Sequence, residues 1–367
     1  MASFYMGIDV SKGYSDFVII NHQKQTVMEN FQLDDTFQGH SQLYEILQDF
    51  LAKHKEAALY AAVESTGGFE NNWYQKLVSF QALLPIQTAR LNPKGVMHNS
   101  KADLTRNKTD KISAKSVAEY LISHPEKVRY QQEDPLASSR KQWSFVQMLT
   151  KQCTQILNQL HSTLYTANPE LLRFCRNGIP DWVLNLLMKY PTAKQLARAN
   201  EKTVAKIPYI TVERAQKLIA AAKDSVASSD DEVSAQLIIS MATQIQHLRK
   251  HIDAQNKLMA KQCDLPEVQL LKTFVGIGDI LSIGLMIEIQ SIARFKTVKQ
   301  FGAFWGVHPV YKISGDGSGS FKMSKQGRGQ PRRLLYLVAL TAINHNSVIK
   351  SLYEYHLKKG REKMDAI

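Results

Sequence analysis

The first 125 residues alternate short apolar runs with polar or glycine-rich breaks. Predicted elements are, in chain order, strands within 4–21 and over 26–32, a helix over 39–54, a strand over 59–66, a helix over 69–80, a strand over 82–89, a short helix from Asn92-Pro93 and a helix over 108–123. Strands and turns are inferred from apolar runs bounded by polar and glycine breaks, and helices from apolar residues spaced three or four apart. Because strands come first and helices and strands then alternate, the pattern predicts an α/β domain.

The middle of the chain has a different pattern, with almost no strand signal between about 134 and 265. Apolar residues at helical spacing form two stripes, which comprise Leu149, Ile156, Leu160 and Leu164, and then Ile238, Met241, Ile245, Leu248, Ile252 and Leu258. Stripes of this kind predict long amphipathic helices, paired as a coiled coil.

Two segments in the second half of the chain resemble each other. Residues 204–219 and 271–287 each predict a helix, a short apolar turn and a second helix. The second segment contains Gly276 and Gly278 in its turn, where glycine lets backbone amides approach a phosphate. Both segments suggest helix–hairpin–helix units that bind the DNA backbone, although the first lacks the glycines and is equally well explained by packing alone.

The composition and charge indicate a globular protein with a polyanionic partner. Of 367 residues, 46 are Lys or Arg and 33 are Asp or Glu, which gives a formal net charge of +13. Such an excess favours nucleic acid, since each phosphate contact releases bound counterions. Residues 314–333 hold five Lys or Arg and one Asp among glycines and serines, and therefore predict a basic surface loop leading into a helix at Leu334.

Other features argue against secretion, membrane insertion and structural zinc. The chain start lacks the basic region of a signal peptide, and the longest uncharged apolar stretch, 334–349, is too short for a membrane span. The three cysteines, Cys153, Cys175 and Cys263, are far apart and form no CxxC pair. We therefore expect a reducing cytoplasmic location and no membrane partner.

Three acids are placed where a divalent-metal site would need them. Asp9 and Glu64 each lie at the end of a predicted strand before a turn, and Asp110 begins a predicted helix. Carboxylates from neighbouring strand ends and a helix N-terminus can converge on a pair of cations, and oxygen ligands suit Mg²⁺ or Mn²⁺. Each acid alone could equally be a surface carboxylate or a helix cap.

Six segments together resemble the DEDD transposases of the IS110/IS1111 insertion-sequence family, which includes Piv-type DNA invertases and bridge-RNA-guided recombinases. The segments are GIDVSK (7–12), VEST (63–66), NKTDKISA (107–114), FVGIGDI (274–280), RFKTVKQFGAFWGVHPVY (294–311) and SGDGSGSFKMSKQGRGQPRRLLY (314–336). Each segment alone is a loose match, but their order and spacing together are specific to the family.

The resemblance implies a fold, a mechanism and partners. The N-terminal domain would have a RuvC-like, RNase H-type fold in which Asp9, Glu64 and Asp110 bind Mg²⁺ or Mn²⁺. Ser314 matches the family's serine nucleophile, which attacks the DNA phosphodiester. The residues implied to hold DNA phosphates are Lys322, Lys325, Arg328, Arg332 and Arg333. The family also implies double-stranded DNA, a structured non-coding guide RNA, a homodimer or homotetramer, and a prokaryotic, nucleoid-associated protein.

One position departs from the family pattern. The fourth acid of the family lies three residues after the third, and this chain has Ser113 there. A hydroxyl is a poorer Mg²⁺ ligand than a carboxylate, so the site is either impaired or completed by another acid such as Asp103 or Glu119. An impaired relative that binds nucleic acid without cutting it is therefore an alternative function.

Several other residues allow a competing interpretation. Ser318, Ser320 and Ser324 could replace Ser314 as the nucleophile, although serines in such a loop usually provide only flexibility. His247 and His251 have zinc-protease spacing but are better explained as a solvated helix face. Trp305 and Tyr311 could stack on bases, but the spacing of Trp305 with Phe301 and Phe304 favours a core position.

A second class of function is suggested by the opening GIDVSKG, which resembles the phosphate loop of actin-like ATPases and sugar kinases. That fold needs a repeated α/β domain, which the helical middle does not supply. The sequence thus predicts an α/β-plus-α protein with three parts: a RuvC-like catalytic domain (1–125), a helical coiled-coil region (126–265) and a mainly helical C-terminal transposase domain with a helix–hairpin–helix unit (266–367).

Overall fold

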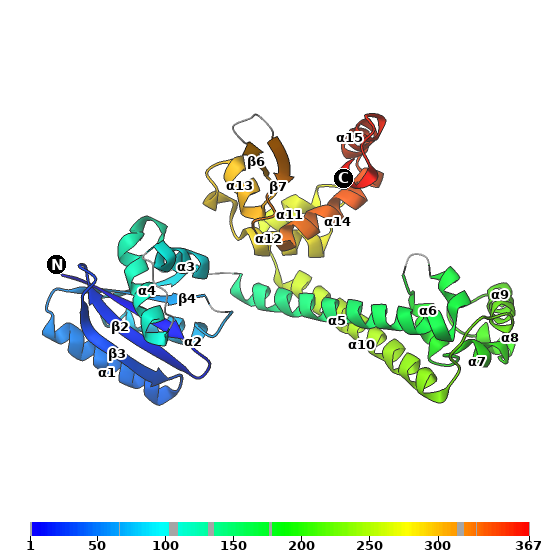
Figure 1. The fold of residues 1–367 in the computed structure, drawn as a ribbon, viewed down its shortest axis with the longest axis horizontal. Coiled ribbons are helices and arrows are strands. Elements are labelled where there is room, and N and C mark those ends of the chain that lie inside the picture. Colours follow the sequence, from blue (N-terminus) through cyan, green and yellow to red (C-terminus); the bar gives the residue numbers. More distant parts are fainter. Residues whose placement is uncertain are drawn as a thin grey trace. The chain divides into compact units, whose positions relative to one another are not determined.

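The computed structural model describes residues 2–65, 67–102, 109–130, 136–175, 178–313, 319–327 and 329–366. The chain divides into two compact units, Met1–Asp134 and Pro135–Ile367 (Figure 1). The predicted boundaries at 125 and 265 remain predictions, since the second unit contains both the helical middle and the C-terminal segment.

Unit 1 is built around a five-stranded mixed sheet. Its elements are β1 (Ser3–Val10), β2 (Tyr14–Asn21), β3 (Thr26–Asp34), α1 (Phe37–Lys53), β4 (Ala58–Glu64), α2 (Asn71–Phe80), β5 (Ile86–Leu91), α3 (Pro93–Ala102), α4 (Asp110–Ser123) and the 3-10 turn η1 (Pro125–Lys127). The strand order is β3-β2-β1-β4-β5. β1, β2 and β3 pair antiparallel, whereas β4 pairs parallel with β1 and β5. This mixed α/β sheet is compatible with a nuclease-like transposase domain.

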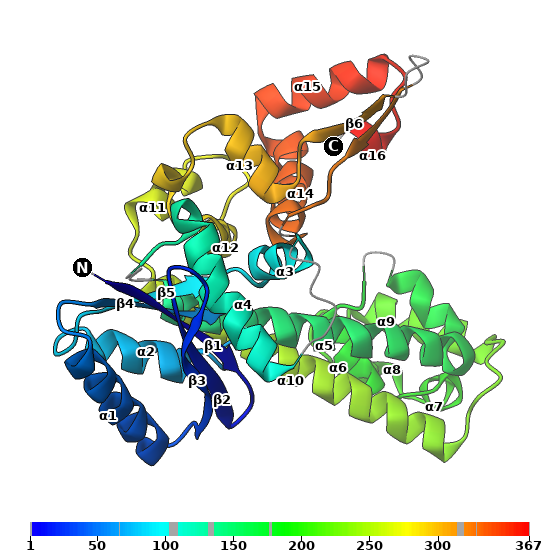
Figure 2. The same cartoon turned by 60° about the vertical axis from the view of Figure 1, so that its left-hand side comes forward.

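Helices cover both faces of this sheet (Figure 2). Side chains alternate between the two faces along each strand, so each face has its own apolar residues to pack against helices. Met6, Ile8 and Val10 of β1 lie in the core formed with α1 and α2. On the other face, Val18 and Ile20 of β2 pack against Ala114 and Ala118 of α4. The alternation thus directs Gly7 and Asp9 of β1 toward the face that α4 covers.

Two long helices of unit 2 run side by side in both views (Figures 1 and 2). They are α5 (Ala137–Ala167) and α10 (Glu232–Gln262), each with 31 residues. Gln142 near the start of α5 donates to Gln255 near the end of α10 at 3.1 Å, so the pair is antiparallel. This confirms the predicted long, paired helices.

Between these two helices the chain forms a small helical bundle. Its elements are η2 (Pro169–Phe174), α6 (Asp181–Leu187), α7 (Ala193–Ala197), α8 (Glu201–Val204) and α9 (Val212–Lys223). Their buried apolar residues continue the core between α5 and α10. Burial of this apolar surface is the main source of stability for such short helices.

The C-terminal segment of unit 2 consists of helices and one two-stranded ribbon. Its elements are α11 (Pro266–Lys272), α12 (Asp279–Ile289), η3 (Ile292–Arg294), α13 (Val298–Trp305), β6 (Pro309–Ile313), β7 (Gly319–Met323), α14 (Gly329–His345), α15 (Ser347–Lys358) and α16 (Lys363–Ala366). α12 is buried along most of its length. Gly284 of α12 lies against Trp143 of α5, where a Cβ would come within 2.6 Å of the indole ring.

Two predicted elements were wrong in their bounds. The strand predicted over 82–89 is β5 at Ile86–Leu91, because the apolar run begins in the turn after α2, where Leu83 is exposed. The surface loop predicted over 314–333 contains β7 and the first turn of α14. Pro331 falls in that first turn, where helical residues have no intrahelical N–H bond to lose, so the helix starts before Leu334.

Candidate functional site

Gly7 determines how closely α4 approaches β1. A Cβ at Gly7 would lie 1.9 Å from the carbonyl oxygen of Ala114, a separation that no side chain can occupy. Only glycine therefore allows the α4 backbone to lie directly on the strand. This close packing places the first turn of α4 over Asp9, which follows Gly7 on the same face of the sheet.

The first turn of α4 carries two of the predicted site residues. Thr109 caps the helix by accepting a hydrogen bond from the Ile112 amide at 3.3 Å. Asp110 is the first residue of the helix and is exposed, while Ser113 is half-buried one turn further on. The Ser113 hydroxyl donates a hydrogen bond to the Asp9 carboxylate. The structure thus brings Asp9, Asp110 and Ser113 together.

The pKa of the Asp9 carboxyl group is raised above its usual value. This pKa is raised from 3.8 to about 6, mainly by burial and then by the negative charges of Asp110 and Asp16, against a smaller opposite effect of the Ser113 hydrogen bond. A carboxylate with these neighbours holds a charge that a cation would stabilise. Asp9 is therefore a candidate cation ligand, and that role remains a prediction.

This acidity predicts a pH dependence of stability in the absence of divalent ions. Because the pKa of Asp9 is raised in the folded state, its contribution is lost as pH rises from about 3.8 to about 6. The free energy of unfolding should therefore fall with rising pH over this range, and the Asp9→Asn variant should lack that part of the slope. Urea denaturation in EDTA at a series of pH values measures it; equal slopes in both proteins would refute the assignment.

Glu64 occupies the neighbouring position on the next strand. Ile8 pairs with Val63 in the parallel register of β1 and β4, so Asp9 and Glu64 come next on each strand. The stacked rings of Tyr5 and Tyr60, with centroids 5.5 Å apart, lie four residues earlier on the same two strands. Since four residues preserve the facing of a strand, Glu64 is on the Asp9 side of the sheet.

The geometry of a complete metal site remains a prediction. Among the residues that the structure describes, no three His, Cys, Asp or Glu side chains are grouped closely enough to hold a metal ion. Carboxylates repel one another when no cation lies between them. The available donors are carboxylate oxygens and one hydroxyl, a set whose chemistry fits Mg²⁺ or Mn²⁺.

Sequence reasoning missed one acid of this face, Asp16. It pairs directly with Asp9 across β1 and β2 and is 5% exposed. Its Oδ2 accepts a hydrogen bond from Gln32 Nε2 at 3.2 Å. The hairpin turn over Ser11, Lys12 and Gly13 was visible in the sequence, and a turn of that length places residue 16 opposite residue 9.

The helix, turn and helix predicted over 271–287 are present as the end of α11, a turn over 273–278 and α12. A helix–hairpin–helix unit that binds DNA remains a prediction. Gly276 has φ +113°, a backbone conformation that favours glycine, and it lies against the backbone of α14. Gly278 is the N-cap of α12. Lys272 pairs with Asp279 in the first turn of α12 at 2.6 Å, so this helix start already has a carboxylate beside it. Phosphate binding by Gly276 and Gly278 remains a prediction.

The first hairpin, between α8 and α9, adopts a similar turn without glycine. Tyr209 has φ +66° two residues before the N-cap Thr211, just as Gly276 lies two residues before Gly278. Tyr209 is 82% exposed, and Ile207 and Ile210 beside it are buried in the bundle. The predicted likeness of the two segments thus extends to their backbone.

The basic residues of the C-terminal segment differ in how far their side chains are exposed to solvent. Lys322, Lys325 and Arg333 are exposed and available to a polyanion. Arg332 is half-buried and donates to the backbone oxygen of Trp305 at 2.8 Å, which gives it a structural role as well. Ser314 and Arg328 lie outside the described residues, and so do Ser318 and Asp103.

Four other competing residues occupy ordinary positions in the fold. Ser324 Oγ accepts a hydrogen bond from the Gln326 amide at 3.2 Å in a turn. Trp305 is buried and packs with Phe301, as its spacing predicted. His247 and His251 are exposed on α10, as expected for a solvated helix face.

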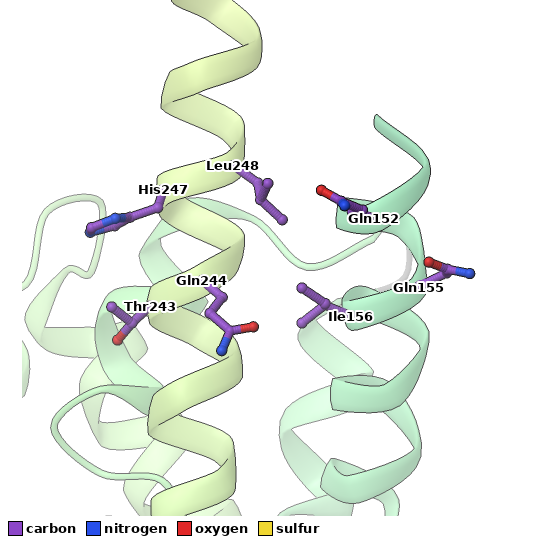
Figure 3. Close-up of a pocket in the computed structure, with 7 residues that line it drawn as sticks. All are labelled: Gln152, Gln155, Ile156, Thr243, Gln244, His247 and Leu248. Carbon is purple, nitrogen blue, oxygen red and sulfur yellow. The ribbon is translucent and has the colours of Figure 1, made fainter. Parts of the chain in front are cut away.

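A hollow of about 530 Å³ lies between α5 and α10. Its lining comprises Gln152, Gln155, Ile156, Thr243, Gln244, His247 and Leu248. Figure 3 shows Ile156 and Leu248 pointing into the space between the helices, whereas His247 points away from α5. None of these lining residues is acidic, so the hollow has no cation-binding carboxylate.

The fold and site together are compatible with the class of DEDD nuclease-like transposases. A family model described as a DEDD transposase of the IS110 type matches residues 6–169, and a model described as the transposase IS116/IS110/IS902 family matches residues 268–354. The two matches together span more than half of the chain and belong to the same family. The chain belongs to the IS110 family of transposases.

No curated protein matches the chain. In the described part of the chain, none of the helices has the length and apolar character needed to traverse a lipid bilayer. The family membership supports DNA transposase activity in general and implies a DNA substrate. The actin-like alternative is not supported, because the described residues contain one α/β sheet of five strands and one ribbon of two strands.

Proposed function

We propose that this chain is a DNA transposase or site-specific recombinase of an insertion sequence, which cuts and rejoins DNA at a site built on the RuvC-like sheet of unit 1. The observation that carries the proposal is that the close packing of α4 on β1 brings Asp110 and Ser113, in the first turn of α4, next to Asp9. The family match over residues 6–169 supports it.

Asp9, Glu64 and Asp110 would hold Mg²⁺ or Mn²⁺ at this site. The bound ions would stabilise negative charge on the phosphate and activate the attacking oxygen. Asp9 must be ionised to bind a cation, which its pKa of about 6 allows at neutral pH. Ser113 would hold the Asp9 carboxylate in position through its hydrogen bond.

Ser314 would be the nucleophile. Its Oγ would form a bond to phosphorus, the phosphodiester bond to the leaving strand would break, and the hydroxyl proton would pass to a base. The support for this assignment is the SG sequence at 314–315 within a segment that resembles the family motif. Lys322, Lys325, Arg328, Arg332 and Arg333 would hold DNA phosphates near this segment, together with the amides at Gly276 and Gly278.

The proposal includes further partners. Double-stranded DNA and a structured non-coding guide RNA would both bind a chain whose net charge is +13. A homodimer or homotetramer is expected, because strand exchange cuts several strands in one assembly, and the helical region would mediate self-association. In a prokaryotic cytoplasm such a protein would be associated with the nucleoid.

One observation favours a second function. Ser113 is neutral where the family has its fourth acid, so this chain could be a relative that binds nucleic acid without cutting it. The hydrogen bond from Ser113 to Asp9 fits either function.

The test measures strand breakage in a plasmid. The plasmid carries the gene that encodes this chain together with the DNA on either side of that gene. We expect strand breakage with Mg²⁺ or Mn²⁺ and its complete loss in EDTA. Salt-sensitive binding of DNA or RNA without breakage under either ion would instead support the non-catalytic function.

A further inference from the structure

We propose that Asp16 is the fourth carboxylate of the divalent-metal site and supplies the negative charge that Ser113 lacks. The inference rests on the proposed function, because it assigns a further ligand to the same site. It accounts for the departure at Ser113 without requiring the site to be impaired.

The position of Asp16 follows from the β1–β2 hairpin. Its turn is closed by a hydrogen bond from the Ser11 amide to the Tyr14 carbonyl at 3.0 Å, and Gly13 adopts φ +95°. This turn fixes the register in which Asp9 pairs with Asp16. Residues directly opposite in an antiparallel pair have Cβ atoms about 5 Å apart on the same face. The two carboxylates are therefore neighbours.

Asp16 also faces the start of α4. Val18, two residues further along β2, lies on the same face and packs against Ala114. Ala114 is one turn beyond Asp110, and Ser113 precedes it. Moving from Val18 to Asp16 leads back toward the end of β1 that holds Asp9. Asp16 thus lies on the face where Asp9 meets the first turn of α4.

Asp16 is buried beside a second carboxylate, and no described cationic side chain pairs with it. Asp16 is 5% exposed, and its carboxylate accepts a hydrogen bond from the neutral amide of Gln32. In the described part of unit 1, Asp16 forms no ion pair with Lys, Arg or His. A buried carboxylate that faces a second carboxylate costs free energy unless a positive charge compensates it. A bound divalent ion between Asp9 and Asp16 would supply that charge.

The other acids suggested for this role are placed less well. Glu119 lies six residues after Ser113 on α4, so it projects from a different side of the helix, and its carboxylate is 3.9 Å from Lys115 Nζ. Asp103 lies outside the described residues. Asp16 is thus the best-placed carboxylate among the described residues for the missing fourth ligand.

Isothermal titration of the full-length protein with Mn²⁺ tests the assignment. The variants are Asp16→Asn, Asp9→Asn, Ser113→Asp and the double variant Asp16→Asn/Ser113→Asp. Asparagine keeps an oxygen that can accept the Gln32 hydrogen bond, so Asp16→Asn removes charge with little change of shape. Glu29→Gln, at an exposed position of β3, is the matched control for loss of one negative charge.

We expect Asp16→Asn to weaken Mn²⁺ binding at least about tenfold, and Ser113→Asp to restore the affinity in the double variant. The melting temperature without metal should not fall in Asp16→Asn, whereas the increase caused by Mn²⁺ should shrink. Glu29→Gln should leave both quantities unchanged.

Three results would overturn the assignment. Unchanged Mn²⁺ affinity in Asp16→Asn beside a loss in Asp9→Asn would refute the role of Asp16 and leave the proposed function intact. Failure of Ser113→Asp to restore the affinity would show that Asp16 does not replace the missing acid. Unchanged affinity in Asp9→Asn as well would refute the metal site itself.

Discussion

The Asp9→Asn variant is expected to lose metal-dependent DNA cleavage by at least about a thousandfold. Metal ions at a phosphoryl-transfer site contribute several kcal/mol to the barrier, and each 1.36 kcal/mol corresponds to a factor of ten in rate. Asp9 is the acid that the other site residues surround, since Asp110, Asp16 and Ser113 all act on its pKa. Its loss should therefore disable the whole site.

The measurement is the rate of strand breakage under Mg²⁺, with DNA binding measured in parallel. Glu29→Gln removes one negative charge at an exposed position of the same unit and should cleave at a rate within about twofold of the unchanged protein, because a surface substitution has little effect. Cleavage by Asp9→Asn at a rate similar to this control would show that the metal site lies elsewhere.

Ser314→Ala is expected to abolish covalent protein–DNA adducts while DNA binding remains intact. The reason is chemical: alanine has no hydroxyl to form the bond to phosphorus. Adducts can be trapped by denaturing the reaction and separating free DNA from protein-linked DNA.

Ser324→Ala is the matched control for this experiment. The Ser324 hydroxyl accepts a hydrogen bond from the Gln326 amide, so its removal disturbs one turn and leaves Ser314 in place. Adducts should persist in Ser324→Ala. Adducts that survive in Ser314→Ala would exclude Ser314, and their loss in Ser324→Ala alone would point to Ser324.

The sequence predicted the two long helices of unit 2 well because the apolar repeat that defines each helix is local in sequence. Apolar residues repeat at helical spacing along α5 and α10, and each stripe packs against the other in an antiparallel pair. The sheet of unit 1 was predicted less accurately at its edge. The apolar run that precedes Ile86 continues through a turn, so its length did not reveal where β5 begins.

The site could be predicted only in part, because its neighbours depend on tertiary contacts. Asp9 and Asp110 were found from strand-end and helix-start positions, and the structure brings them together. The role of Gly7 could not be predicted from the sequence alone, since it depends on how closely α4 approaches β1. Asp16 lies within an apolar strand, and its pairing with Asp9 becomes visible only when the hairpin register is worked out.

The structure around the exposed C-terminal basic residues was also difficult to predict from the sequence. Lys322 and Lys325 were expected in a loop, whereas Lys322 lies on β7. Short strands such as β6 and β7 depend on each other for pairing, and a glycine-rich sequence gives little periodic signal. The charge of this segment was therefore easier to predict than its structure.

The most direct test of the account is electron paramagnetic resonance of Mn²⁺ titrated into the full-length protein and its Glu64→Gln variant. If carboxylates from β1, β4 and α4 share divalent ions, the unchanged protein should bind two Mn²⁺ whose spins are coupled, since paired ions lie about 3.5–4 Å apart. Glu64→Gln should lose that coupled signal. Absence of saturable Mn²⁺ binding in the unchanged protein, or the same coupled signal in both proteins, would contradict the account.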